Sequence, residues 1–394
     1  MYYLNVLFIY ILLLLIYCPN ISSSLPSYHQ YHLPLIQDGY IRLTNILPEE
    51  EIIKYRTLIY SAMEKELHDC RKCSLSSSTT TANLHDLTDP ICSTCDTTTL
   101  TSDKSIQKSF YRYRRLLSYE PTLQSLYYSP ILGRIAAQIM NVSKVRFYQS
   151  TIFIKYPNDQ PSAWHQDSAA IPLHSDKIIT LWLNLDTVYN TSGILRFIKY
   201  SHLSNVSLPS LRNIPLVQRL SSMQKWTDED INRLLPNAII DEPPLIMNIG
   251  SGTFHLGWTL HGSKANTSPI LRPAVAITYF ADGARIHPEL LRVEELSTSS
   301  SSNEPDNKGI KLSTQDGTSI IVRLLADDKA TWLKWLQARP PILIPGSPVK
   351  DDRLTPIIYD STKDEEFLQN QPSQSNSNNK KNRKRKREKE DNEL

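Results

Sequence analysis

The hydrophobic and polar positions of the chain change their period part-way along it. Apolar residues recur at helical spacing in two early segments, 49–67 and 120–140. From residue 144 to residue 280 they instead form short runs that Pro, Gly, Asn and Ser separate. A helix buries a stripe with a period of about 3.6 residues, whereas short β-branched and aromatic runs are typical of strands. The pattern therefore predicts an α+β domain in which N-terminal helices support a core of two sheets, a jelly roll.

The predicted elements have recognisable boundaries. Residues 37–43 predict a strand and 45–48 a turn, and Glu49–Glu51 then place negative charge where it suits the dipole of the first helix. The apolar stripe of this helix consists of Ile52, Ile53, Leu58, Ile59 and Met63. Further strands are predicted at 144–156, 177–188, 193–198, 246–256 and 273–280, and a partly helical segment at 204–240 interrupts them.

The first 17 residues are almost wholly apolar, and no Lys, Arg, Asp or Glu precedes Asp38. The run is shorter than the roughly 20 residues that span a membrane, and small residues follow it. Residues 1–24 therefore predict a secretory signal peptide, with a retained membrane anchor as the alternative. We expect the protein in the secretory pathway, in the ER lumen, secreted, or associated with the membrane through its N-terminus. Glycosylation there would use five Asn-x-Ser sequons: Asn20, Asn141, Asn190, Asn205 and Asn266.

The formal net charge of +3 is unevenly distributed. Residues 376–394 carry eight Lys/Arg and four Asp/Glu, a net of +4, which leaves about −1 for the rest of the chain. A protein that binds nucleic acid normally has a basic body, so no nucleic-acid partner is expected. Residues 371–394 predict a disordered basic tail, or alternatively a nuclear-import signal. Residues 296–370 predict an extension with one short amphipathic helix.

Residues 163–169 read AWHQDSA and contain the first candidate chemistry. In an extended segment His165 and Asp167 point the same way, with Cα atoms about 7 Å apart, and Gln166 points the opposite way. Both side chains could therefore reach one metal ion. His255 and His261 compete as the third ligand, and Gly262 and Ser263 follow the second of these.

Two histidines and one carboxylate form the facial triad of non-haem Fe(II) oxygenases, which leaves one face of the iron open. A cosubstrate that chelates the metal through a 2-oxo acid needs a fixed cation for its far carboxylate. Arginine suits this role because its planar fork pairs with a carboxylate through two hydrogen bonds. Arg272, eleven residues after His261, is the candidate.

The combination of His165-Gln166-Asp167, His261-Gly262-Ser263 and Arg272 resembles the phytanoyl-CoA dioxygenase family. The resemblance covers residues 36–67 and 106–290, within a domain of residues 36–292. It implies a double-stranded β-helix and an Fe(II)- and 2-oxoglutarate-dependent dioxygenase. Such an enzyme uses O₂ with ascorbate as reductant, hydroxylates an organic substrate and releases succinate and CO₂.

The resemblance also implies roles for single residues. His165, Asp167 and His261 would bind iron, Arg272 and Ser263 would hold the distal carboxylate of 2-oxoglutarate, and Trp182 would line the cosubstrate pocket. We interpret His255 as a core or supporting histidine rather than a ligand. On the strand of Trp182, the residues that share its face are Thr180 and Asn184, and the opposite apolar face consists of Ile179, Leu181, Leu183 and Leu185.

The substrate is not fixed by these motifs, because one fold serves many reactions. A small-molecule or lipid-like compound is expected, and the candidate contacts are Gln166, Gln149 and Arg285. The alternative function is a catalytically silent barrel that acts as a binding or scaffold protein.

A Ser/Thr-rich insertion, residues 68–105, departs from the family pattern. We interpret it as a loop. It contains two Cys-x-x-Cys pairs, formed by Cys70, Cys73, Cys92 and Cys95. Their spacing predicts a structural zinc site, and two disulfides are the alternative in an oxidising lumen.

Overall fold

The computed structural model describes residues 26–76, 109–113, 116–171, 173–203, 226–286, 292–294, 310–313, 319–323, 348–349 and 355–363. The predicted leader, most of the insertion, the amphipathic helix of the extension and the basic tail lie outside these residues. Among the described residues, no helix is both long and apolar enough to span a membrane.

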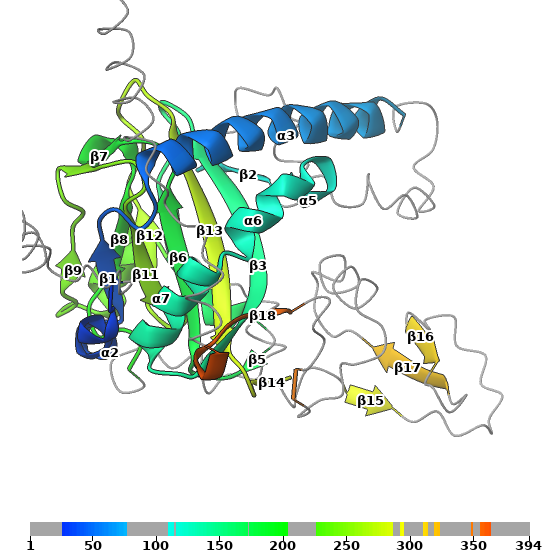
Figure 1. Cartoon of the computed structure of the whole chain (residues 1–394). Coiled ribbons are helices and arrows are strands. Elements are labelled where there is room, and N and C mark those ends of the chain that lie inside the picture. Colours follow the sequence, from blue (N-terminus) through cyan, green and yellow to red (C-terminus); the bar gives the residue numbers. More distant parts are fainter. Residues whose placement is uncertain are drawn as a thin grey trace, which may run out of the picture.

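The described core consists of antiparallel strands in two main sheets (Figure 1). The larger sheet has the order β1 (Tyr40–Leu43), β11 (Gly252–Leu256), β6 (Ile178–Asn184), β13 (Arg272–Ala281), β3 (Lys144–Lys155) and β18 (Ile357–Asp360), and β2 (Tyr111–Tyr113) also pairs with β3. The smaller sheet has the order β4 (Ser162–His165), β12 (His261–Ser263), β8 (Leu195–Ile198) and β9 (Ile240–Asp241). Each predicted strand region contains at least one of these strands.

Several short strands pair outside the two main sheets. β5 (Leu173–His174) pairs with β14 (Arg285–Ile286), and β7 (Val188–Tyr189) pairs with β10 (Ile246–Met247). A further small sheet contains β15 (Arg292–Glu294), β17 (Ser319–Arg323) and β16 (Ile310–Ser313).

Helices cover one face of the larger sheet, as Figure 1 shows. They are α2 (His32–Asp38), α3 (Glu49–Ser76), α5 (Leu116–Tyr119), α6 (Gln124–Tyr127) and α7 (Pro130–Met140). The main hydrophobic core lies between them and the sheet, where Ile52, Ile59 and Ile135 pack with Leu181 and Leu183. The predicted apolar face of β6 therefore lies against the helices. Ile53, predicted to share the stripe of α3, is instead 40% exposed.

The other face of the larger sheet packs against the smaller sheet. The ring of Tyr40 on β1 stacks on that of Phe197 on β8, with centroids 4.3 Å apart. Trp182 belongs to this second cluster, on the face of β6 opposite to Leu181 and Leu183. The two faces of β6 thus serve two separate interiors, as the alternation of its residues predicted.

Three boundaries differ from the sequence predictions. Gln37 and Asp38, predicted to begin a strand, end helix α2, and β1 begins only at Tyr40. Helix α3 continues to Ser76, so the first nine residues of the segment predicted as a loop, 68–76, are helical. Adding residues to an existing helix costs little, which explains why weak local propensity did not end it. The predicted C-terminal extension contributes β18 to the main sheet, where Ile358 packs in the main core and Lys144 pairs with Asp360.

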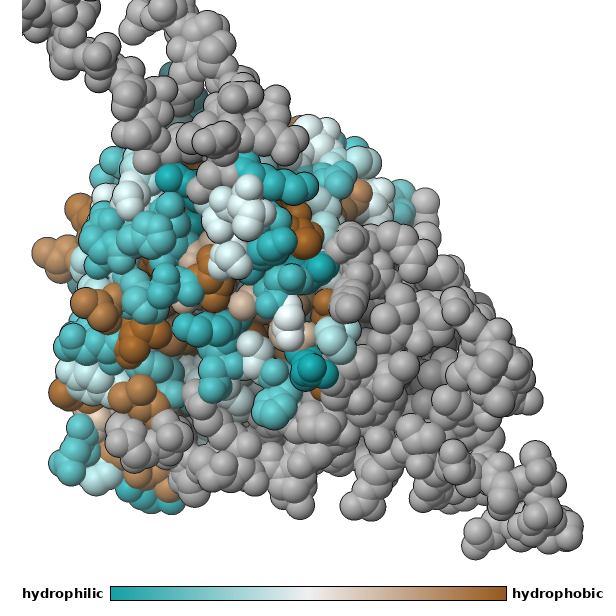
Figure 2. All heavy atoms as spheres, turned by 60° about the horizontal axis from the view of Figure 1, so that its bottom comes forward, coloured by the Kyte–Doolittle hydropathy of each residue, from teal (hydrophilic) through white to brown (hydrophobic). Residues whose placement is uncertain are grey.

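Figure 2 shows one face of the molecule, on which hydrophobic residues form several separate groups among hydrophilic ones. The most exposed large apolar side chains of the described residues are Leu33 and Leu245. Such a mixture of apolar and polar side chains on the surface is normal for a globular domain.

Candidate metal centre and anion pocket

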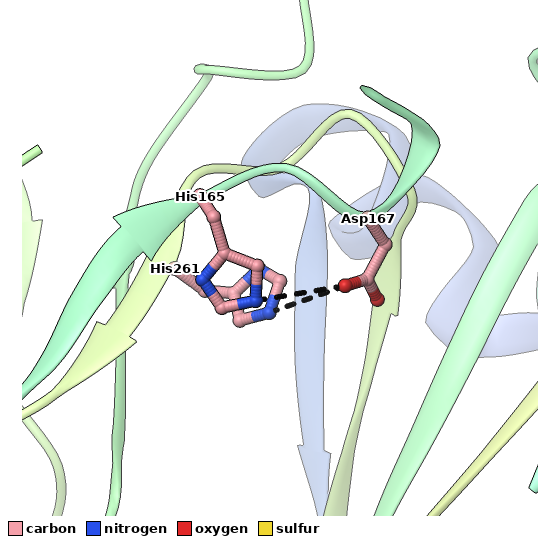
Figure 3. A group of neighbouring side chains, drawn as sticks. All are labelled: His165, Asp167 and His261. Atoms are coloured by element: carbon pink, nitrogen blue, oxygen red, sulfur yellow. Dashed lines mark ion pairs between the residues drawn. The ribbon is translucent and has the colours of Figure 1, made fainter. Parts of the chain in front are cut away.

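Two histidines meet because two strands of the smaller sheet pair in register. His165 ends β4 and lies directly opposite His261, the first residue of β12. Their ring centroids are 4.2 Å apart. Figure 3 shows both imidazoles on the same side of the strands, facing Asp167.

Backbone contacts orient both rings in the same way. Nδ1 of His165 lies 3.0 Å from the carbonyl oxygen of Ala163, and Nδ1 of His261 lies 3.0 Å from that of Thr259. A carbonyl oxygen only accepts, so each Nδ1 carries a proton, and in the neutral ring Nε2 then keeps a lone pair. The two lone pairs are therefore available to a metal ion.

Asp167 completes the group from the short helix η5 (Asp167–Ala169), which follows β4. Its Oδ1 lies 3.7 Å from Nε2 of His165 and 3.7 Å from Nε2 of His261 (Figure 3). The three ligand atoms all lie within 4.8 Å of one another. Two nitrogens and one carboxylate oxygen in this compact arrangement form a donor set that suits Fe(II).

The second oxygen of Asp167 is held by the larger sheet. Thr180 Oγ1 donates a hydrogen bond to Oδ2 at 2.7 Å, and Nε2 of His255 lies 3.3 Å from the same oxygen. His255 is buried on β11 and is not part of the three-residue group. Thr180 and His255 therefore fix the carboxylate so that Oδ1 faces the two imidazoles.

The local charges favour an ionised Asp167 and a neutral His261. Burial alone would raise the pKa of Asp167, but His261, His255 and His165 outweigh it and hold that pKa well below its usual range. Burial and the neighbouring His255 lower the pKa of His261 to about 4, despite the opposing effect of Asp167. Both protonation states are those that metal binding requires.

Buried positive charge lies in the same interior as the metal centre, because Trp182 beside Arg272 and Phe197 beside His261 belong to one hydrophobic cluster. We call the region around Arg272 the anion pocket. Arg272, the first residue of β13, is buried, and its Nε and Nη1 have no hydrogen-bond partner among the described residues. Its guanidinium lies over the ring of Trp182, with Cζ 4.9 Å from the centroid. Burial lowers the pKa of Arg272 to about 10, so the group stays charged near neutral pH. A buried cation with unsatisfied donors indicates a site for an anion.

Ser263 connects this pocket to the metal centre, because it lies two residues after His261 on β12. It is fully buried, and its Oγ lies 2.7 Å from Oγ of Ser162 and 2.9 Å from Nζ of Lys155. The structure brings Arg272, Ser263 and Trp182 around one interior. Their roles toward a cosubstrate stay predictions.

A family model for phytanoyl-CoA dioxygenase matches residues 35–274 of the chain, which is more than half of its length. The chain belongs to the phytanoyl-CoA dioxygenase family. The three clustered residues and Arg272 all lie within the matched range. The resemblance predicted from the sequence is confirmed.

One curated relative is the probable alpha-ketoglutarate-dependent hypophosphite dioxygenase of Stutzerimonas stutzeri. It is 29% identical over 140 residues, which are 36% of this chain and 46% of the relative. The match therefore spans less than half of the relative's length.

Solved structures show a similar fold. The non-heme alpha-ketoglutarate-dependent carbocyclase SnoK from nogalamycin biosynthesis aligns with a TM-score of 0.50 at 18% identity, over 85% of this chain and 97% of that one. EctD from S. alaskensis, solved with 2-oxoglutarate and 5-hydroxyectoine, aligns with a TM-score of 0.42 at 17% identity, over 67% and 80% of the two chains. At 18% identity the likeness to SnoK concerns the fold alone.

The three residues predicted to contact substrate lie in different surroundings in this family member. Gln166 is buried, and its amide donates to the carbonyl oxygen of Trp258. Gln149 is exposed on β3. It lies opposite Thr278 of β13, and Thr278 lies opposite Thr180 of β6. Because paired residues share a face, Gln149 lies on the sheet face that carries the metal centre. Arg285 is exposed on β14, opposite His174, and the structure does not bring it into the three-residue group.

The cysteine prediction lies almost wholly outside the described residues. Cys70 and Cys73 belong to the last turns of α3, but their side chains are not described, and neither are Cys92 and Cys95. Zinc binding and disulfide formation both stay predictions.

Lys155 and the contacts of Thr180 were not predicted from the sequence. Lys155 ends β3 as a fully buried lysine, and its signal in the sequence is a charged residue within the apolar run of residues 152–156. Thr180 was placed on the correct face of its strand, but its bond to Asp167 depends on a residue in the other sheet. Such a contact has no local signature.

Proposed function

We propose that the protein is an Fe(II)- and 2-oxoglutarate-dependent dioxygenase that hydroxylates an organic substrate and releases succinate and CO₂. One observation carries this proposal: a compact His-Asp-His group and a buried guanidinium with unpaired donors share one interior. Membership of the phytanoyl-CoA dioxygenase family supports it. We also infer that the two main sheets correspond to the double-stranded β-helix, or jelly roll, expected of this enzyme class.

Ferrous iron with 2-oxoglutarate and O₂ supplies an oxidant strong enough to hydroxylate an unactivated C–H bond. His165, Asp167 and His261 would hold the metal from one side and leave its other side open. Arg272 and Ser263 would bind the distal carboxylate of the cosubstrate, and Trp182 would keep the guanidinium in place through ring contact. The buried walls around Arg272 exclude water, which strengthens this charge pairing.

The exposure of the three metal-binding side chains indicates from which side a substrate would approach. The side chain of His165 is 41% exposed and that of Asp167 is 23% exposed, whereas that of His261 is 5% exposed. We therefore infer that a small-molecule or lipid-like substrate enters past His165, with Gln149 as the favoured polar contact.

Succinate release from 2-oxoglutarate tests the proposal. The purified protein is incubated with Fe(II), O₂ and ascorbate as reductant, and Asp167→Ala is compared with the wild type. We expect slow turnover without a second substrate in the wild type, and both turnover and iron binding at background level in the variant, because the only anionic ligand is lost. Asp176→Ala, which removes an exposed carboxylate nine residues further on, is the matched control.

Two results would contradict the proposal. Absence of both succinate and bound iron with the wild type would favour the alternative, a silent barrel that acts as a binding or scaffold protein. Equal turnover by the wild type and Asp167→Ala would show that the His-Asp-His group is not the reaction centre.

We propose a location in the secretory pathway, and the sequons sharpen this proposal. Asn141 and Asn190 are exposed, whereas Asn266 is buried and its amide donates to the carbonyl oxygens of Lys155 and Ile270. We expect glycans on the two exposed asparagines and none on Asn266 in the folded protein. A reporter fused to residues 1–30 that stays unglycosylated would contradict this location. Entry of the whole protein into the nucleus through its basic tail would contradict it as well.

A further inference from the structure

Lys155 is a buried cation next to the anion pocket. It is fully buried at the end of β3 and lies opposite Arg272 in the register of β3 and β13. Its Nζ donates to Ser263 Oγ at 2.9 Å and to the carbonyl oxygen of Lys264 at 2.7 Å. Both acceptors are neutral oxygens.

Two buried cations therefore lie side by side, and neither forms an ion pair with a carboxylate among the described residues. Such an arrangement is costly, because burial removes water and the like charges repel each other. Burial and the charge of Arg272 lower the pKa of Lys155 to about 7, with a smaller opposing effect of Asp159 and a further lowering by Arg196. The surplus of positive charge indicates that a bound anion completes this part of the molecule.

The hydrogen bonds of Ser263 show how Lys155 would act on that anion. A serine hydroxyl accepts two hydrogen bonds and donates one. A lysine ammonium only donates, so Lys155 occupies one acceptor site of Ser263 Oγ, and Ser162 occupies the other when it donates. The proton of Ser263 is then free to point toward an anion beside Arg272.

Gly193 provides the room for this lysine. It has a φ of 73°, and a Cβ built on it would lie 2.9 Å from Cδ of Lys155 and 2.7 Å from the carbonyl oxygen of Lys264. A positive φ is adopted most readily by glycine, which has no Cβ. The backbone therefore approaches the lysine more closely than any other residue at this position would allow.

We propose that Lys155 is a positioning residue of the cosubstrate pocket, which directs the Ser263 hydroxyl toward the distal carboxylate and adds a second positive charge beside Arg272. This inference rests on the proposed use of 2-oxoglutarate. It extends the sequence prediction, in which Arg272 is the sole cation of the pocket.

A comparison of two 2-oxo acids tests the inference without turnover. 2-Oxoglutarate and 2-oxopentanoate share the chelating end, but the second has a methyl group in place of the distal carboxylate. Calorimetry under anaerobic conditions, with Ni(II) in place of Fe(II), gives the Kd of each acid. We expect Lys155→Met to weaken binding of 2-oxoglutarate about 10-fold and to change the Kd of 2-oxopentanoate less than about twofold.

Two further variants separate charge from hydrogen bonding. Lys155→Gln keeps a donor near Ser263 without the charge, so we expect an intermediate loss of 2-oxoglutarate affinity. Lys144→Met is the matched control at the other end of β3, where the lysine pairs with Asp360 at the surface, and both affinities should stay unchanged. An equal loss for both acids in Lys155→Met would identify a merely structural role and overturn the inference.

Proton uptake provides a second measurement on the wild type alone. Near pH 8, where Lys155 is mostly neutral, a bound carboxylate favours its charged form, so binding of 2-oxoglutarate should take up close to one proton. Calorimetry in two buffers of different ionisation enthalpy measures this number. No uptake would overturn the inference even if the variants fail to fold. No binding of 2-oxoglutarate by a wild type that still binds Ni(II) would overturn both this inference and the proposed function.

Discussion

Asp167 lies among three imidazoles, whereas Arg272 and Lys155 lie beside each other with neutral oxygens or an aromatic ring as their nearest partners. The metal centre thus contains a carboxylate that can balance a bound metal ion, whereas neither cation of the anion pocket forms an ion pair with a carboxylate among the described residues. Both are built where β12 meets the larger sheet, through His261 and Ser263. Buried charge that the protein leaves without an ion pair therefore indicates that a ligand is needed there.

Removal of the Arg272 guanidinium should produce the largest loss of ligand affinity. We expect Arg272→Met to weaken binding of 2-oxoglutarate at least about 100-fold, because two charge-assisted hydrogen bonds are lost. The same change should stabilise the ligand-free protein, since a buried unpaired cation is removed. Calorimetry and urea unfolding measure the two effects, with Arg233→Met on the exposed face of α9 (Asp228–Leu234) as the control. A large loss of stability in ligand-free Arg272→Met would show that other groups of the protein already balance the charge of Arg272.

At the metal centre, we expect a smaller effect from removing the hydrogen bond that Thr180 donates to Asp167. Thr180→Val keeps the shape of the side chain but removes the donor to Oδ2. We expect metal affinity to fall about 10-fold, as is typical for partners that orient a ligand. Titration with the metal in a calorimeter measures this affinity. Thr278→Val leaves the bond between Thr180 and Asp167 in place and should have a smaller effect, so equal losses in the two variants would count against this role of Thr180.

A further predicted effect concerns the dependence of stability on pH. The pKa of Lys155 is about 7 in the folded protein and near its ordinary value of 10.5 in the unfolded chain. Between these values the unfolded chain binds more protons, so the free energy of unfolding should rise with pH. From pH 7 to pH 9 we expect the ligand-free wild type to gain about 2 kcal/mol relative to Lys155→Met. Urea unfolding at both pH values measures the gain, and a flat difference would place the lysine in its charged form throughout.

The parts of the molecule with local signatures could be predicted from the sequence. His165 and Asp167 are separated by one residue, and because Gln166 between them is extended, both lie on one side although Asp167 already begins η5. The alternation along β6 likewise placed Trp182 and Thr180 on one face and Leu181 on the other. His261 and Arg272 required the family pattern, because 96 residues separate the two histidines.

The remaining features depend on contacts between distant segments. A lysine near the end of a strand normally reaches solvent, and only the approach of Gly193 and Ser263 encloses Lys155. Strand β18 is a short apolar run within a polar region, and its register with β3 is fixed by Val145 and by the ion pair of Lys144 with Asp360. Neither contact follows from the period of the residues involved.

The outer edge of β3 is covered in two halves, by β18 along residues 144–146 and by β2 along residues 152–154. β2 precedes β3 in the chain and β18 follows the other strands of the main sheet. Together the two short strands satisfy backbone groups that would otherwise be open to a neighbouring molecule. A chain shortened before residue 355 would leave half of this edge bare. Because an uncovered edge can pair with the same edge of another copy, we expect such a shortened protein to self-associate through β3.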